Sequence, residues 1–148
     1  MTSEAQIKSV ALFFSLALLD DQLAGQAALA TLYRLRKKTD KQNLSELQQQ
    51  AQMVSLMSKI WLRYCKYLNT SQGATYTGGL NTLKNDFIDL GPWREFRRMT
   101  DDNEFLSVLW LQVIGFEEEA IAEGLNTTVG TVRHRVSRGL KYLGERMI

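Results

Sequence analysis

The segment from Asn126 to Leu143 contains four basic residues and one histidine, side chains that can pair with phosphates or hydrogen-bond to base edges. A helical step of about 100° per residue separates this segment into an apolar side and a polar side. The apolar side is expected to pack inward and consists of Val129, Val132, Val136, Leu140 and Leu143. The polar side and its flanks consist of Thr128, Gly130, Thr131, Arg133, His134, Arg135, Arg138 and Lys141.

The place of each polar residue along this helix suggests its role. A recognition helix points its N-terminal residues at the base edges of the major groove. The polar side chains between Thr128 and His134 are therefore expected to meet bases or nearby phosphates, with Gly130 allowing close backbone approach. Arg135, Arg138 and Lys141 are expected to pair with phosphates. Taken singly, each residue also fits a solvated helix face, and Thr128 fits a simple helix cap.

The residues just before this helix complete a helix-turn-helix pattern. Thr100-Asp101-Asp102 predicts a helix start and Gly115 its end, and a short helix follows over residues 117–123. Leu125 is expected to plug the core, and Asn126 tolerates the left-handed backbone of a tight turn. Thr128 can cap a final helix that runs to about Gly144. This order is the one found in DNA-binding helix-turn-helix units.

Charge is distributed unevenly over this region. Residues 101–127 contain seven acidic residues and no basic one, whereas residues 128–148 contain five basic residues and one acidic residue. Bases near a helix C-terminus complement its dipole, which accounts for Lys141 and Arg146 but not for Arg133 and Arg135 near the helix start. The asymmetry therefore indicates an anionic partner for the last helix. Glu117–Glu119 are interpreted as a solvated face.

Three further helices are predicted over residues 3–68, which gives an all-α chain. Ser3, Asp20 or Asp21, and a Ser45–Gln48 capping box mark their starts. Their apolar stripes are expected to be buried: Ile7, Val10, Ala11, Phe14 and Leu18; Leu23, Ala27, Ala28, Leu32 and Leu35; Leu47, Ala51, Val54, Met57, Ile60, Tyr64 and Leu68. Residues 69–90 are predicted to be a flexible linker, and Pro92 starts a short helix that ends at Met99. The sequence thus predicts a domain over residues 1–68 and another over residues 91–148.

Composition argues against several classes of protein. Cys65 and His134 are the only cysteine and histidine, so neither a disulfide framework nor a zinc site of Cys/His type is expected. The apolar run over residues 9–19 is too short to span a bilayer and is interpreted as a core helix. No catalytic set is apparent, and Gly78-Gly79 lacks the lysine of a phosphate-binding loop. We expect a cytoplasmic protein that is not an enzyme and has no cofactor or metal.

Residues 118–143, EEAIAEGLNTTVGTVRHRVSRGLKYL, resemble region 4 of bacterial RNA polymerase sigma factors, especially the extracytoplasmic-function type. The matching positions are Ile121, Ala122, Glu123, Leu125, Gly130, Thr131, Val132, Arg135, Ser137, Arg138 and Leu143. Thr128 occupies the position of a capping serine, and Gly139 occupies a position where alanine is usual. LuxR-type regulators have a related pattern, but the spacing of Arg135 and Arg138 favours the sigma family.

The first half is similar to sigma region 2 at a weaker level. Residues 19–38 resemble the polymerase-binding segment, although Gly25 and Gln26 replace the usual acids. Residues 45–68 resemble the promoter-melting helix, although Gln52 is near the usual tryptophan and Lys59 near the usual asparagine. The resemblance implies a polymerase-binding face of Asp20, Asp21, Gln26, Tyr33 and Arg36. It also implies a promoter-melting face of Lys59, Arg63, Tyr64, Lys66 and Tyr67.

This resemblance implies a sigma factor or sigma-like transcription initiation factor. Its partners would be core RNA polymerase, promoter DNA and a regulatory protein of the anti-sigma kind. In the family, region 4 reads the minus-35 promoter element and region 2 opens the minus-10 element. Phe105 and Trp110 are expected in the core of region 4. Two alternatives stay open, namely a stand-alone helix-turn-helix regulator that dimerises on palindromic half-sites, and a degenerate sigma-like protein that acts through protein partners.

Overall fold

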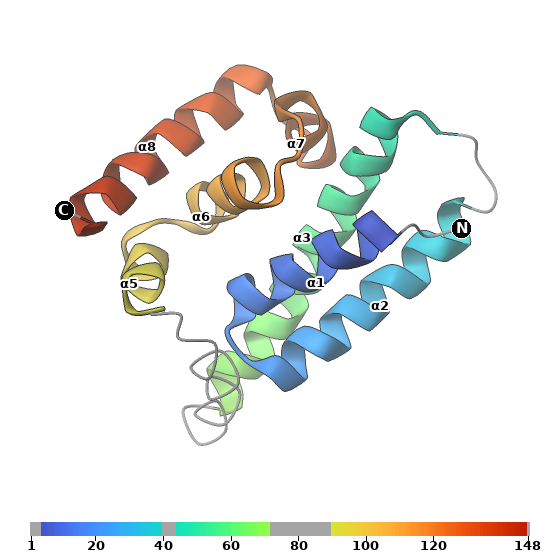
Figure 1. The fold of residues 1–148 in the computed structure, drawn as a ribbon, viewed down its shortest axis with the longest axis horizontal. Helices are drawn as coiled ribbons and strands as arrows, with labels where there is room; N and C mark the ends of the chain where they lie inside the picture. The colour runs from blue at the N-terminus through green and yellow to red at the C-terminus, as the bar shows by residue number, and fades with distance from the viewer. Residues whose placement is uncertain (1–3, 40–43, 72–89, 148) are drawn as a thin grey trace.

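The structure, a computed structural model, describes residues 4–39, 44–71 and 90–147, which form seven α-helices and one π-helix and no strand (Figure 1). The predicted all-α fold is confirmed. The elements are α1 (Glu4–Leu18), α2 (Asp21–Thr39), α3 (Glu46–Ser71), α5 (Gly91–Met99), α6 (Asp102–Val108), η1 (Leu109–Ile114), α7 (Glu118–Gly124) and α8 (Val129–Met147).

Side-chain caps explain where several of these helices begin. The Asp20 carboxylate accepts a hydrogen bond from the Leu23 amide at 3.0 Å and so caps α2. Ser45 and Gln48 form the predicted capping box, with amide-to-side-chain distances of 3.0 and 3.2 Å. The predicted cap at Ser3 lies outside the described residues. Helix α3 continues to Ser71, so residues 69–71 of the predicted linker are helical, and residues 72–89 lie outside the described part of the chain.

The buried side of α1 is broader than one stripe. Ile7 and Ala11, both predicted to be buried, are exposed, as is Leu47 of α3, whereas Phe13 is fully buried. Phe13 is buried because α1 packs against α2, α3 and η1 at once, so its inward arc includes side chains on two flanks. Phe13 stacks on Trp110 of η1, with ring centroids 5.3 Å apart and an interplanar angle of 4°.

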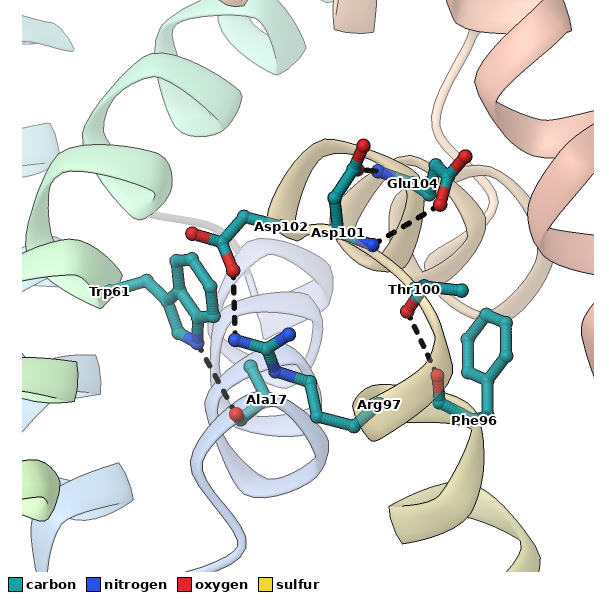
Figure 2. A network of polar contacts seen from close by, with 8 residues as sticks. All are labelled: Ala17, Trp61, Phe96, Arg97, Thr100, Asp101, Asp102 and Glu104. Atoms are coloured by element: carbon teal, nitrogen blue, oxygen red, sulfur yellow. Dashed lines mark hydrogen bonds and ion pairs between the residues drawn. The ribbon is translucent and has the colours of Figure 1, made fainter.

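The two halves of the chain share one hydrophobic core. Trp93 of α5 donates its indole N–H to the Leu16 carbonyl oxygen at 2.8 Å. The Arg97 guanidinium lies 5.2 Å from the ring centroid of Trp61 and 5.0 Å from that of Phe105. Figure 2 shows Arg97 between Trp61 and the start of α6, where it pairs with Asp102 at 2.9 Å. Aromatic and cationic groups therefore join α3 to α5 and α6.

The backbone of helix α7 packs directly against the N-terminal half of α3 (Figure 1). A Cβ added to Gly124 would lie 2.6 Å from the Ala51 carbonyl oxygen and 2.7 Å from the Val54 Cβ, so only glycine fits without displacement. The side-chain oxygen of Gln50 accepts the Glu117 amide at 2.9 Å and satisfies a donor at the start of α7. This contact and the aromatic contacts near Trp61 lie toward opposite ends of α3.

Candidate nucleic-acid interface

A short helix, a turn and a longer helix follow one another here in the predicted order, as α7, the turn over residues 125–128 and α8. Asn126 has a φ of 57°, the left-handed conformation expected for this turn. The Thr127 amide donates to the Ala122 carbonyl oxygen at 2.8 Å, which closes the end of α7. Leu125 is half-buried and packs against the core, as predicted. The turn therefore fixes the direction in which α8 leaves α7.

Thr128 caps α8. Its hydroxyl accepts the Thr131 amide at 3.1 Å, and the two threonine hydroxyls lie 2.9 Å apart in a hydrogen bond. The cap satisfies one of the free amides at the helix start. Two of the side chains expected to contact DNA are thereby ordered before any ligand arrives.

The inward side of α8 differs from the prediction at one position. Val132 and Val136 are buried and Val129 and Leu143 are partly buried, but Leu140 is 37% exposed, so the prediction that it packs inward is wrong. The buried neighbour is Gly139, whose added Cβ would lie 2.5 Å from the Val108 Cγ2. Because α8 crosses α6 at this glycine, the centre of the inward arc is shifted away from Leu140.

The predicted DNA-contacting residues form one outward surface of α8, which runs along the outer edge of the molecule (Figure 1). Most of these side chains are exposed, and only two are half-buried, Thr131 and Arg135. The exposed members are Thr128, Gly130, Arg133, His134, Arg138 and Lys141. The surface is therefore accessible to a ligand while the two halves of the chain are packed together.

Two of the arginines on this surface are paired with acidic side chains of the preceding region. The Arg133 guanidinium contacts both oxygens of Glu118, at 2.8 and 3.3 Å, and this pairing raises the pKa of Arg133. The Arg138 Nε lies 3.2 Å from an oxygen of Glu104. Sequence reasoning missed both pairs and interpreted Glu118 only as part of a solvated face. The acidic block therefore offsets part of the positive charge of α8.

The predicted promoter-melting residues lie on the C-terminal half of α3, with helical spacing that places most of them on one stripe. Lys59, Arg63, Lys66 and Tyr67 are exposed, whereas Tyr64 is half-buried, with its ring centroid 5.5 Å from that of Tyr67. Leu62, which sequence reasoning did not select, is exposed beside this stripe. Trp61 is fully buried and cannot offer a base-stacking surface in this arrangement.

The predicted polymerase-binding residues lie on α2. Gln26, Tyr33 and Arg36 are exposed and Asp21 is half-buried. Asp20 is buried because its carboxylate caps α2, so its inclusion in this face is corrected.

Leu29, which sequence reasoning missed, is 71% exposed between Gln26 and Tyr33. The Lys37 ammonium lies 4.6 Å from the centroid of the Tyr33 ring. This face of α2 is thus a mixed apolar and cationic surface.

No helix that the structure describes is both long enough and apolar enough to cross a membrane. Within residues 4–39, 44–71 and 90–147, no three His, Cys, Asp or Glu side chains gather where they could hold a metal ion.

Comparison with known proteins supports the fold. No protein-family model matches the chain, and a search of curated proteins finds no relative. A search of solved structures finds the sigma factor RpoE from Bartonella quintana, whose co-crystal structure also contains the anti-sigma factor NepR. The match has a TM-score of 0.69 at 16% sequence identity and covers 95% of this chain and 91% of that one. The chain therefore has a sigma-factor-like, all-α fold across both of its halves.

Proposed function

We propose that this protein is a sigma factor or sigma-like transcription initiation factor that binds core RNA polymerase and recognises promoter DNA. The observation that carries the proposal is the exposed polar surface of a capped recognition helix, α8, on a chain whose fold matches a sigma factor over nearly its full length. In this role α8 reads the upstream promoter element in the major groove.

The other two surfaces fit the same role. The stripe on α3 combines three cationic side chains with exposed Tyr67, a combination suited to a single strand of nucleic acid. Leu29 and Tyr33 are large apolar residues exposed close together on α2, and clustered exposure of this kind marks protein-binding surfaces. We assign α2 to the contact with core polymerase.

A specific observation also favours a second candidate, a sigma-like protein that acts through a regulatory protein partner. Arg133 and Arg138 are already paired with acids of this chain, which weakens the case for DNA binding by α8. The structural neighbour was crystallised with an anti-sigma factor. In this role the protein would bind a partner of that kind, and its activity would not depend on Arg133.

The deciding experiment is a pull-down of core RNA polymerase, followed by transcription from bound promoters in a purified system. The test variant is Leu29→Ala with Tyr33→Ala on α2. The matched control is Leu12→Ala, which removes an exposed leucine from α1. The proposal expects the wild type and the control to retain polymerase and the α2 variant to lose it. DNA binding with no polymerase association would instead support a stand-alone regulator. Polymerase-independent capture of a regulatory protein, unaffected by Arg133→Ala, would support the second candidate.

A further inference from the structure

Glu104 uses both of its carboxylate oxygens to join two helices. Its Oε1 accepts the Asp101 amide at 3.2 Å, and the Asp101 carboxylate in turn accepts the Glu104 amide at 2.7 Å, which completes the capping box of α6 (Figure 2). Its Oε2 lies 3.2 Å from the Arg138 Nε of α8. The cap of α6 and the recognition helix are thus connected through one side chain.

The acid of the Glu104–Arg138 pair is more deeply buried than the acid of the Glu118–Arg133 pair. The side chain of Glu104 is 8% exposed, whereas that of Glu118, the partner of Arg133, is 27% exposed. A buried carboxylate that loses its cation keeps an uncompensated charge away from water, and this is strongly unfavourable. Arg133 can therefore exchange Glu118 for a phosphate at little cost, while Arg138 cannot leave Glu104 so readily.

The surroundings of Arg138 also suit a fixed contact. The next residue, Gly139, packs closely against α6, and its added Cβ would be 3.5 Å from the Glu104 carbonyl oxygen. A hydrogen bond with Tyr142 and the charge of Glu104 raise the pKa of Arg138. The pair thus lies beside the crossing point, where it can resist rotation of α8 about its own axis.

We propose that Glu104 and Arg138 form a strut that sets the rotation of α8 against α6, and that Arg138 is a positioning residue and not a phosphate contact. The proposal rests on DNA binding by α8 and refines it. Arg133 is then the exchangeable arginine of this surface, and the exposed ridge of His134 and Lys141 is presented at an angle that Glu104 fixes.

The first test measures binding of a 30-base-pair duplex of mixed sequence by fluorescence anisotropy over a series of KCl concentrations. Each phosphate contact contributes about −0.9 to the slope of log K against log salt. Arg133→Gln is expected to make this negative slope shallower by about 0.9, whereas Arg138→Gln weakens binding and leaves the slope unchanged. A slope that becomes shallower by about 0.9 in Arg138→Gln would overturn the strut.

Matched removal of an acid gives a second readout. Glu104→Gln and Glu118→Gln each remove one negative charge near α8. Glu118→Gln is expected to strengthen duplex binding because it frees Arg133, whereas Glu104→Gln is expected to weaken it because α8 loses its fixed rotation. Stronger binding by both variants would mean that Glu104 merely competes with phosphate.

A stability measurement decides the strut independently of DNA. In urea unfolding, Arg138→Gln should lose more stability than Glu104→Gln, because it leaves the buried Glu104 carboxylate without its cation. The double variant should lose less than the sum of the two single losses, because both changes break the same pair. Additive losses would overturn the strut even if the duplex results agreed with it. A wild-type protein that binds no duplex would contradict DNA binding by α8 in the free protein, on which this proposal rests, while non-additive losses in the same protein would still establish the pair and confine its role to the fold.

Discussion

At the scale of single residues, the structure assigns a local role to several side chains that the sequence linked to DNA. Thr128 was expected both to cap α8 and to meet DNA, and the cap is present in the structure. Arg133 and Arg138 have intramolecular partners that lie 15 and 34 positions earlier in the chain, at Glu118 and Glu104. Helical periodicity identifies the surface on which a residue lies. It does not identify pairs between helices, because these depend on how the helices cross.

The cap at Thr128 gives a direct stability prediction. Thr128→Ala removes the acceptor for the Thr131 amide and should lower the free energy of unfolding by about 1 kcal/mol, measured by urea denaturation. Thr128→Ser keeps the hydroxyl and should remain close to the wild type. Equal stability of the alanine variant and the wild type would show that the cap is not stabilising.

Cys65 gives a prediction for pH dependence. Burial raises the pKa of the thiol from 9.0 to about 11. The positive charge of Arg97 lowers this pKa in part, and the negative charge of Asp102 raises it further. Because the thiolate is the reactive form, alkylation by iodoacetamide at pH 8 should be about a hundredfold slower in the folded protein than in urea. The folded state keeps this proton at pH values where the unfolded state releases it. The contribution of Cys65 to stability should therefore be complete below pH 9 and fall as the pH rises towards about 11. Equal alkylation rates in the two states would contradict this assignment.

At the scale of elements, most helix starts could be predicted because the signals are local. Asp20, Ser45 with Gln48, Asp101 and Thr128 all cap helices at or beside the expected positions. The π-helical segment η1 was not predicted, and no local signal marks it. Its last turn closes with both the Gly115 and Phe116 amides on the Trp110 carbonyl oxygen, while Trp110 stacks on Phe13 from the other half of the chain. Such a segment depends on tertiary packing, which local patterns do not contain.

The crossing of α8 over α6 depends on Gly139. Gly139→Ala places a Cβ 2.5 Å from the Val108 Cγ2 and should destabilise the protein by about 1–3 kcal/mol, although alanine favours helices. Gly144→Ala, in the same helix with no atom within 4 Å, should stabilise it by up to about 1 kcal/mol. Urea denaturation checks both, and Val108→Ala should restore part of the loss in Gly139→Ala. Stabilisation by Gly139→Ala equal to that of Gly144→Ala would show that the crossing is not tight.

At the scale of the whole molecule, the packing of the two halves constrains the proposed function. The minus-10 and minus-35 elements are separated by about 25 base pairs, or roughly 85 Å of duplex at 3.4 Å per base pair. Helix α3, with 26 residues, is about 39 Å long at 1.5 Å per residue, and α7 lies against its N-terminal half. Surfaces on α3 and α8 therefore cannot reach both elements at once in this arrangement. If the chain acts at both elements, its halves must separate.

Separation of the halves can be followed with the single cysteine of the chain. Gly124→Ala forces a Cβ to within 2.6 Å of the Ala51 carbonyl oxygen and strains the contact between α7 and α3 by about 1–3 kcal/mol. Cys65 lies near the other end of α3, close enough to Arg97 and Asp102 for their charges to act on its pKa. If the halves separate as units, strain at Gly124 also exposes Cys65. Its alkylation rate should then rise at least about fivefold, up to the roughly hundredfold limit set by the rate in urea, since about 1.4 kcal/mol corresponds to a factor of ten.

The control for this experiment is Gly25→Ala in α2, where an added Cβ meets no atom within 4 Å and the alkylation rate should not change. Faster alkylation in Gly124→Ala but not in Gly25→Ala would mean that contacts at the two ends of α3 break together. The strain at Gly124 acts at one end of the interface, and the Cys65 thiol reports from the other. An unchanged rate in Gly124→Ala, together with reduced stability, would mean that α7 detaches locally while the aromatic contacts around Trp61 stay closed. In that case a partner would have to break the Phe13–Trp110 stack and the Arg97 contacts directly before this chain could span a promoter.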